Sequence, residues 1–226
     1  MKFSESTKKI LENYAGISTG IIIPATKEGE NNTLLQACDK TKMVIATSMV
    51  QETLSNDVCL SDLKAFLSTI STLKDPEITL ASDHMIINDG SFNVRIVYGD
   101  PSTVTRLKKK LELPTGKYTF ELKEESLAKL LNLSGILGLP DLRLYSEAGK
   151  IYFQVLDRKN PSTNTGAIEV GSGDFEAGEE YFFQRELLKM IPGDYTVEII
   201  LTEKAKVSRF KSANHDSLEY IIALAI

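Results

Sequence analysis

The sequence predicts an α+β protein made of two similar domains, each with two helices packed on antiparallel strands. The main evidence is a unit of one amphipathic helix followed by short strands, which occurs in residues 60–97 and again in residues 124–156. Two weaker helix starts, at Ser4 and near Gln184, complete four copies. Their period is about 60 residues, and a fixed period is typical of repeat architectures.

The two clear copies match at two fixed offsets. Over the helix and first strand, the matching residues are Leu63, Phe66, Leu67, Leu73, Pro76, Ile78 and Leu80 with Leu127, Leu130, Leu131, Leu137, Pro140, Leu142 and Leu144. After a turn that is shorter in the second copy, Phe92, Val94, Ile96 and Val97 match Ile151, Phe153, Val155 and Leu156. Four half-units favour two domains, and a chain of 226 residues is long enough to bury a core in each.

Composition is that of an ordinary globular protein, with 42% apolar and 25% charged residues. No apolar run reaches the roughly 18 residues of a membrane span, and the N-terminus lacks the apolar region of a signal peptide, so we expect a cytoplasmic protein. In that compartment Cys38 and Cys59 are expected to be buried thiols, with a disulfide as the alternative. A net charge of −5 argues against nucleic-acid binding over the whole surface, but allows a basic patch on one face.

In the first half, Ser4 is expected to cap a helix whose apolar stripe runs to Gly16. A second helix is expected to start at Ser61 and to stop at Asp75-Pro76, because the residue before proline is forced out of the helical region. Asn88-Asp89-Gly90 predicts a hairpin turn. The expected strands are 17–23, 34–38, 42–50, 53–60, 78–82, 85–88 and 91–98.

Residues 99–116 interrupt this pattern, with turn residues at both ends and a basic cluster of Arg106, Lys108, Lys109 and Lys110. They are interpreted as one further strand plus a connector. We therefore expect one domain in residues 1–110 and a second in residues 111–226.

In the second half, helices are expected over residues 123–137 and, in a shorter form, over residues 184–191, where Pro192-Gly193 stops the helix. The expected strands are 117–122, 141–146, 150–157, 167–171, 180–183, 195–202, 206–211 and 218–226.

The search for a reactive constellation gives none. The two histidines, His84 and His215, have no metal-ligand spacing and no nearby serine elbow. Gly171-Ser172-Gly173 precedes a strand, so it is not a dinucleotide fingerprint, and no phosphate-binding loop is present. We expect a protein that is not an enzyme and binds no cofactor or metal.

Each expected helix carries cations opposite its apolar stripe. These are Lys8, Lys9, Lys64, Lys123, Lys129, Arg185 and Lys189. The same helices carry carboxylates, namely Glu5, Glu12, Asp62, Glu124, Glu125 and Glu186. A mixed charged face is usually just a solvated one, and facing nucleic acid is the alternative. The basic cluster at 106–110 and the hairpin at 204–211 allow the same two interpretations.

Several stretches, in this order, resemble one known family. They are MKFSESTKKILENYAGISTGI at the start, LSDLKAFLSTIS at 60–71, GDPSTV at 99–104, PGDYTVEIIL at 192–201 and the EYIIALA ending. Together they resemble the DNA polymerase sliding clamps, or processivity factors, of T4-like bacteriophages. The resemblance covers the whole length and implies a DNA-clamp fold. It implies two similar domains per subunit in a non-enzymatic homotrimeric ring, with helices lining the hole and strands forming the outer wall.

The resemblance also implies partners: duplex DNA bound without sequence preference, the phage DNA polymerase, a clamp-loader ATPase and the late-transcription machinery, in the cytoplasm of the infected bacterium. The seven cations named above would then face the DNA. Partner peptides would bind near the connector and the last strand, at Val104, Leu107, Leu111, Leu113, Leu224 and Ile226, for which ordinary core packing is the alternative. Subunits would pair residues 103–111 of one copy with residues 167–171 of the next.

Two other functions stay open on the residues alone. A viral structural or assembly protein built from duplicated β-rich domains would explain the repeats, but it would not require cations on all four helices. A single-strand binder would need exposed aromatic side chains beside the basic residues, and the helix faces offer none.

Overall fold

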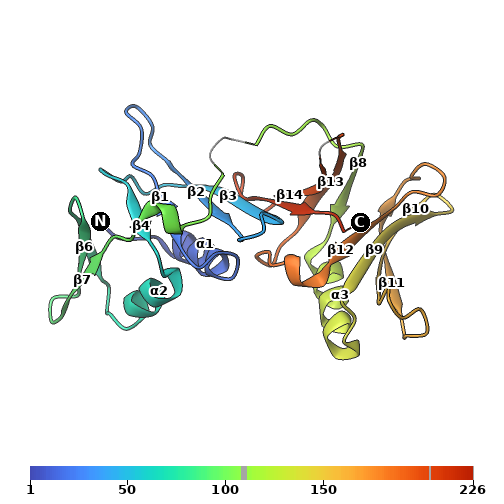
Figure 1. The fold of residues 1–226 in the computed structure, drawn as a ribbon, viewed down its shortest axis with the longest axis horizontal. Coiled ribbons are helices and arrows are strands. Elements are labelled where there is room, and N and C mark those ends of the chain that lie inside the picture. Colours follow the sequence, from blue (N-terminus) through green and yellow to red (C-terminus); the bar gives the residue numbers. More distant parts are fainter. Residues whose placement is uncertain (108–110, 204, 226) are drawn as a thin grey trace. The chain divides into compact units, whose positions relative to one another are not determined.

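The computed structural model describes residues 1–107, 111–203 and 205–225. The chain divides into two compact units, Met1–Lys110 and Leu111–Ile226. Each unit has its own helices, strands and core (Figure 1).

The first unit contains two helices and three groups of antiparallel strands. Strands β1 and β4 pair with each other, as do β2 and β3, and β5, β6 and β7 follow one another as a meander. The elements are α1 Glu5–Ala15, β1 Ile21–Ile23, β2 Thr33–Cys38, β3 Val44–Val50, β4 Val58–Leu60, α2 Leu63–Ser71, β5 Glu77–Leu80, β6 His84–Asn88, β7 Asn93–Val97 and a 3-10 turn, η1, at Pro101–Thr103.

The second unit packs one long helix on antiparallel strands. One sheet has the order β11-β10-β9-β12, and β8, β13, β14 and β15 pair successively in another. The elements are β8 Tyr118–Leu122, α3 Glu124–Leu137, β9 Asp141–Glu147, β10 Lys150–Leu156, β11 Gly166–Ser172, β12 Glu180–Gln184, a 3-10 turn η2 at Arg185–Leu187, β13 Tyr195–Leu201, β14 Lys206–Ser212 and β15 Glu219–Ala223.

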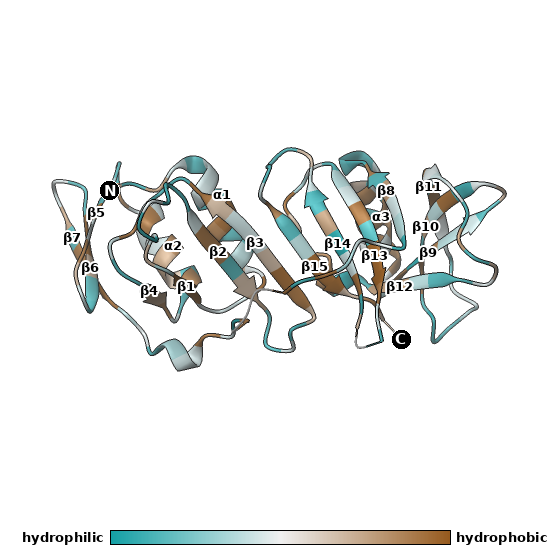
Figure 2. Ribbon diagram, turned by 90° about the horizontal axis from the view of Figure 1, so that it is seen from above, coloured by the Kyte–Doolittle hydropathy of each residue, from teal (hydrophilic) through white to brown (hydrophobic). Residues whose placement is uncertain are grey.

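Each helix buries its apolar stripe inside its own unit. In the first unit α1 packs beside α2, and the ring of Phe3 meets that of Phe66 edge-on with centroids 6.2 Å apart. In the second, Leu127 and Leu130 of α3 are buried, and the helix packs on β10 and β11. Burial of one such side chain contributes about 1.5–3 kcal/mol. The apolar residues that form these cores are brown in Figure 2.

The repeat is confirmed for the helix and the first strand, but its second offset is wrong. Helix α2 is followed by β5, β6 and β7, and α3 is followed by β9, β10 and β11. The offset that matches Phe92 with Ile151 aligns the third strand of one unit with the second strand of the other. Counted from the helix, β7 corresponds to β11. Alternating apolar residues recur in every strand, so the pattern alone allowed the wrong match.

The fourth expected helix, over residues 184–191, is wrong among the residues that the structure describes. Only the 3-10 turn η2 forms there, and Leu188 leaves the helical region with ψ of 55°. Gln184 supplies no side-chain cap, and Pro192 leaves too few residues to offset the cost of helix nucleation. The period itself persists, because the four segments begin at Glu5, Leu63, Glu124 and Arg185.

The remaining elements follow the expected order, with shifted ends. The hairpin at Asn88-Asp89-Gly90 is confirmed, with Gly90 at φ +89°, and both cysteines are free and buried. The cap of α2 is Asp62, not Ser61, since the Asp62 carboxylate accepts the Ala65 N–H at 2.9 Å. The strands expected from residues 17 and 53 begin only at Ile21 and Val58.

The further strand expected between residues 99 and 116 is absent from the described part of that stretch. Residues 99–107 contain only η1, and residues 111–116 contain no regular element. Lys108, Lys109 and Lys110 of the basic cluster, Lys204 of the basic hairpin, and Ile226 lie outside the described residues.

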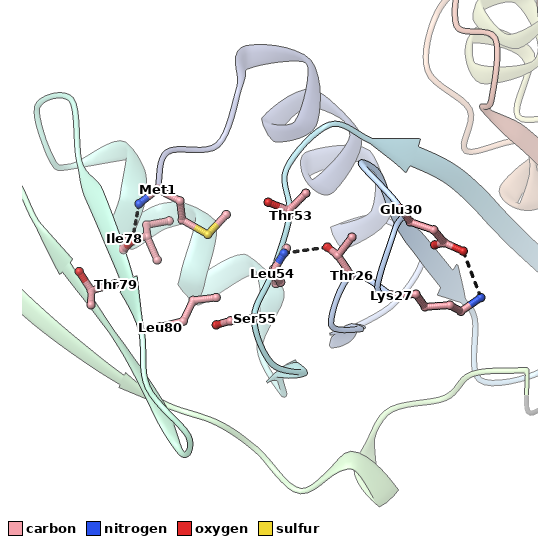
Figure 3. Close-up of a pocket in the computed structure, with 10 residues that line it drawn as sticks. All are labelled: Met1, Thr26, Lys27, Glu30, Thr53, Leu54, Ser55, Ile78, Thr79 and Leu80. Atoms are coloured by element: carbon pink, nitrogen blue, oxygen red, sulfur yellow. Dashed lines mark hydrogen bonds and ion pairs between the residues drawn. The ribbon is translucent and has the colours of Figure 1, made fainter.

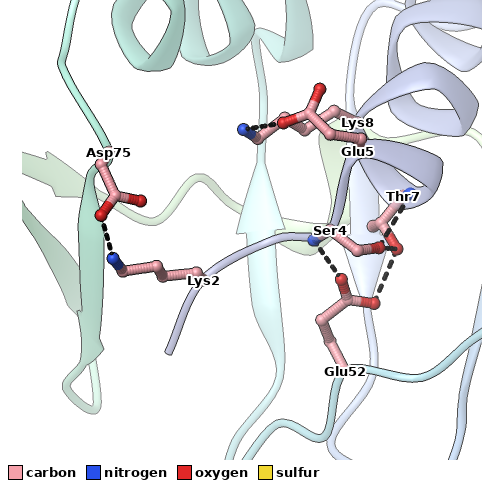
Figure 4. Close-up of polar contacts among 7 residues, drawn as sticks. All are labelled: Lys2, Ser4, Glu5, Thr7, Lys8, Glu52 and Asp75. Atoms are coloured by element: carbon pink, nitrogen blue, oxygen red, sulfur yellow. Dashed lines mark hydrogen bonds and ion pairs between the residues drawn. The ribbon is translucent and has the colours of Figure 1, made fainter.

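The Glu52 carboxylate, which lies outside α1, stabilises the start of this helix (Figure 4). Glu52 accepts the backbone N–H of Ser4 and the hydroxyl of Thr7, both at 2.6 Å, while the Ser4 hydroxyl accepts the Thr7 N–H at 3.2 Å. Burial raises the pKa of the Glu52 carboxyl, but the hydrogen bonds from Thr7 and Ser4 lower it more, so its pKa lies below the ordinary value. The ionised form of Glu52 is therefore the one that the fold stabilises.

Replacement of Glu52 by Gln should lower the free energy of unfolding by about 1–2 kcal/mol at pH 7, because a charged acceptor of two hydrogen bonds is lost. Since the folded pKa lies below the unfolded value of about 4.3, this stabilisation is complete above that value and disappears as the pH falls through the folded pKa. Urea unfolding of wild type and variant at several pH values tests this. The matched control is Glu147→Gln, at an exposed carboxylate. A difference that stays constant down to acid pH would contradict the assignment.

Candidate nucleic-acid interface

Helix α1 presents a charged face opposite its buried stripe. With about 100° between successive residues, Lys9 lies at the centre of this exposed face, between Glu5 and Glu12. Lys8 lies to one side, half-buried, and its ammonium is 2.8 Å from a carboxylate oxygen of Glu5 (Figure 4). The two adjacent lysines therefore differ, and Lys9 is the more exposed of the two.

Helix α2 presents a face of small side chains beside α1. One cation, Lys64, stands on it, and no ion pair of Lys64 occurs in the part of the chain that the structure describes. The other exposed residues of this face are Ala65, Ser68, Ser71 and Thr72. This face of α2 therefore exposes one positive charge and several hydroxyl groups.

Helix α3 carries two of the expected cations, and both are paired. Lys129 forms an ion pair with Glu125 one turn earlier, and the Lys123 ammonium lies 2.8 Å from Asp194. Asp194 also accepts the Glu124 N–H at 2.9 Å, so it supports the first turn of the helix. The hydrogen bond with Lys123 lowers the pKa of Asp194 and raises that of Lys123.

The two cations of the fourth segment lie on and just after η2. The guanidinium of Arg185 rests against Gly135 of α3, where an added Cβ would come within 3.1 Å of an Arg185 nitrogen. Among the described residues Arg185 makes no ion pair. Lys189 is exposed two residues after the turn. In each unit the expected cations thus occur on helices or on the turn beside a helix.

The sequence pattern did not distinguish paired from unpaired cations. The spacings of Glu5 with Lys8 and of Glu125 with Lys129 are those at which helix neighbours meet, so these two pairs had a readable signal. Asp194 is 71 residues from Lys123 and had none. Because the lysines of these three pairs already have a carboxylate partner, Lys9, Lys64 and Arg185 are the best candidates to contact a phosphate group.

The expected partner-binding residues divide into buried and accessible ones. Val104 is buried with Ile22 and Cys59, and Leu224 is also buried, as the packing alternative supposes. Leu107 and Leu113 are half-buried, and the Leu107 N–H donates to the Gln36 side chain at 3.0 Å. Leu111 is the most accessible, with 41% of its surface exposed.

The first unit contains a hollow without the groups of a reaction site. It has a volume of about 650 Å³ and is bounded by Met1, β5, the segment at Leu54 and the loop at Thr26 (Figure 3). Its polar groups include hydroxyls, one exposed ion pair, Lys27 with Glu30 at 3.5 Å, and the N-terminal ammonium of Met1, which donates to the Ile78 carbonyl at 2.7 Å. Within the described residues no group of His, Cys, Asp and Glu side chains could hold a metal ion, and no helix could span a membrane.

The sequence is similar to phage proteins that are named Sliding clamp. It is 31% identical to that of Vibrio phage KVP40 over 229 residues, covering 99% of this chain and 98% of the relative. It is 27% identical to those of Enterobacteria phage T4 and Escherichia phage RB69, each over 99% of this chain and 96% of the relative. The family model described as gp45 sliding clamp, C terminal, matches residues 119–226.

Solved clamp structures share the fold. One is A. fulgidus PCNA bound to the C-terminal region of FEN-1, with a TM-score of 0.70 and 13% identity over 97% of this chain and 94% of that chain. Another is the H. pylori beta clamp, with a TM-score of 0.74 and 11% identity over 97% of this chain and 63% of that chain. The near-complete match to the KVP40 protein goes beyond fold, and the chain belongs to the phage sliding-clamp family.

Proposed function

We propose that this sliding clamp closes into a homotrimeric ring around duplex DNA and tethers the phage DNA polymerase for processive replication. One observation carries the proposal: each unit has an open strand edge at an equivalent position. Strand β7 ends one sheet and β11 ends another, and each is the third strand after its helix. An exposed edge invites pairing with another chain. Pairing β7 of one copy with β11 of the next satisfies both edges and repeats around a closed ring.

The side chains at β7 support this pairing. Val97 is 61% exposed and Phe92, just before the strand, is 60% exposed, and Ile86 of the adjacent strand is also exposed. Apolar side chains gathered at a strand edge are typical of an interface. The pairing of residues 103–111 with 167–171 is the alternative arrangement, and in this chain the described residues 103–107 and 111 form no strand.

Replacement of Val97 by Glu should weaken the ring, because a charge would be buried between paired edges. The control is Met49→Glu, which alters a methionine that is 39% exposed on β3, a strand that takes no part in the proposed pairing. Molar mass in solution, measured by light scattering over a dilution series, should give three times 25.0 kDa for wild type and control. The V97E trimer should dissociate at a protein concentration at least about tenfold higher than that at which the wild-type trimer dissociates. A wild-type monomer at every concentration would contradict the ring.

We further propose that the exposed faces of α1, α2 and α3 and the turn η2 line the hole, with Lys8, Lys9, Lys64, Lys123, Lys129, Arg185 and Lys189 toward the duplex. A clamp must hold DNA by topology and still move along it. Phosphate contacts carry no sequence information, and a large number of them would fix the protein in place. A few cations, on helix faces that otherwise carry small side chains or nearly equal positive and negative charge, meet both needs.

Charge reversal at Lys9 and Lys64 should reduce retention on nicked circular DNA, or processive synthesis, by about tenfold or more, because two exposed helix cations that form no ion pair among the described residues would then repel phosphate. The control is Lys40→Glu with Lys42→Glu, which makes the same change in net charge at exposed lysines between β2 and β3, outside the helices. The trimer mass should stay unchanged in both. Equal effects of the two double variants would refute the assignment of these helix faces.

The proposed protein partners are the phage polymerase, an ATP-driven clamp loader and the late-transcription machinery, in the cytoplasm of the infected bacterium. Their peptides would dock at the connector, where Leu111 is the most accessible of the apolar candidates. The protein carries out no reaction of its own in this proposal. The structural-protein alternative is dropped because the relatives are clamps.

A further inference from the structure

The cations that face the proposed hole are not equally available, and the difference is built into the helices. On α1 the Glu5 carboxylate lies 2.8 Å from the Lys8 ammonium, with Lys9 one residue further on. On α3 the Glu125 carboxylate pairs with Lys129. In both pairs the acid precedes the base by about one turn. In both pairs the carboxylate is well exposed, at 83% for Glu5 and 77% for Glu125.

The ion pairs themselves add little to the stability of the fold, because exposed pairs of this kind are weak. Both acids lie in the first turn of their helices, where a negative charge favours the helix dipole. Among the described residues no backbone group donates a hydrogen bond to either carboxylate, in contrast to Glu52 and Asp194. The hydrogen bond from Lys8 lowers the pKa of Glu5, and that from Lys129 lowers the pKa of Glu125, so both acids remain ionised beside the cations at neutral pH.

A phosphate that approaches Lys8 or Lys129 must therefore displace a carboxylate that already occupies the ammonium. The same carboxylate repels the phosphate, since it lies well within the screening length of about 8 Å at physiological salt. Both effects weaken each phosphate contact without removing the cation. For a ring that is held by topology, weak and quickly exchanged contacts favour movement along DNA.

We propose that Glu5 and Glu125 are positioning residues for sliding, which compete with DNA phosphates for Lys8 and Lys129 and so keep the ring mobile on the duplex. This inference rests on the proposed function, because it requires these helix faces to meet DNA. It assigns to these two first-turn carboxylates a role beyond the stabilisation of the helix dipole.

The test is the double variant Glu5→Gln with Glu125→Gln in the full-length protein. Its control is Glu30→Gln with Glu180→Gln, which removes two carboxylates from ion pairs with Lys27 and Arg143, in a loop and on a strand. The two double variants change net charge equally. Asp194 is left intact because it also supports the first turn of α3.

Affinity for a short blunt duplex is measured by fluorescence anisotropy over a range of salt concentrations. Each released lysine should strengthen binding by up to about twofold, as expected for loss of an exposed helix pair, so E5Q/E125Q should bind about two- to fivefold more tightly at low salt. Its plot of log affinity against log salt should also be steeper, by up to about 0.9 for each added phosphate contact. Single-molecule tracking of loaded rings should show slower diffusion along DNA.

The outcomes separate the inference from the function on which it rests. If E5Q/E125Q and the control bind DNA alike and diffuse alike, while K9E/K64E loses DNA, the helix faces meet DNA and the role of the two carboxylates is wrong. If K9E/K64E also has no effect, the proposed interface itself fails. If only E5Q/E125Q binds DNA more tightly and diffuses more slowly along it, with an unchanged trimer mass, the inference is supported.

Discussion

Burial of one apolar stripe per helix is the constraint on which the other features depend. Leu11 and Tyr14 of α1, Phe66 of α2 and Leu130 of α3 are almost fully buried within their own units. Once those stripes are fixed, the opposite face of every helix is fixed as well, to within about one residue in the turn. The choice of Lys9 over Lys8 as the outward cation follows from packing and needs no contact with DNA. The orientation of the proposed interface thus follows from core formation.

The charge on these faces is nearly balanced, and the physics of sliding accounts for this balance. A protein that reads DNA gains affinity from each phosphate contact, whereas a ring that encloses DNA gains nothing from tight contacts and loses mobility. Lys64 stands among small and hydroxyl side chains, and Lys129 carries its own carboxylate partner. A net charge of −5 on the whole chain fits this function, because DNA is then repelled from the remaining surface.

The sequence predicted those features that depend on local pattern. Helix α1 with its Ser4 cap, the extent of α3 and the hairpin at Gly90 each follow from apolar spacing, capping or turn chemistry within a few residues. The sequence also predicted the cations of the three α-helices, because opposite faces of an amphipathic helix are legible from spacing alone. Family resemblance supplied the ring and the DNA, which spacing could not.

Features that depend on distant partners were not predictable. Residues 184–191 have a helical pattern, yet they form only a turn, because no cap and a following proline leave nucleation uncompensated. Pairing of Lys123 with Asp194 and capping of α1 by Glu52 join residues far apart in the chain. Strand pattern gives no neighbour order, so it did not indicate that β7 lies at the edge of its sheet, and the expected pairing of residues 103–111 came from the resemblance.

Topological retention on DNA tests the central claim most directly. The clamp is loaded with its phage clamp loader and ATP onto nicked circular DNA, separated from free protein, and followed by gel filtration before and after the circle is cut once. A ring that encloses the duplex through weak contacts stays on the circle and leaves through the free ends after the cut, even at low salt. Equal dissociation from circular and linear DNA would show that contacts, not enclosure, hold the protein, and would contradict this account.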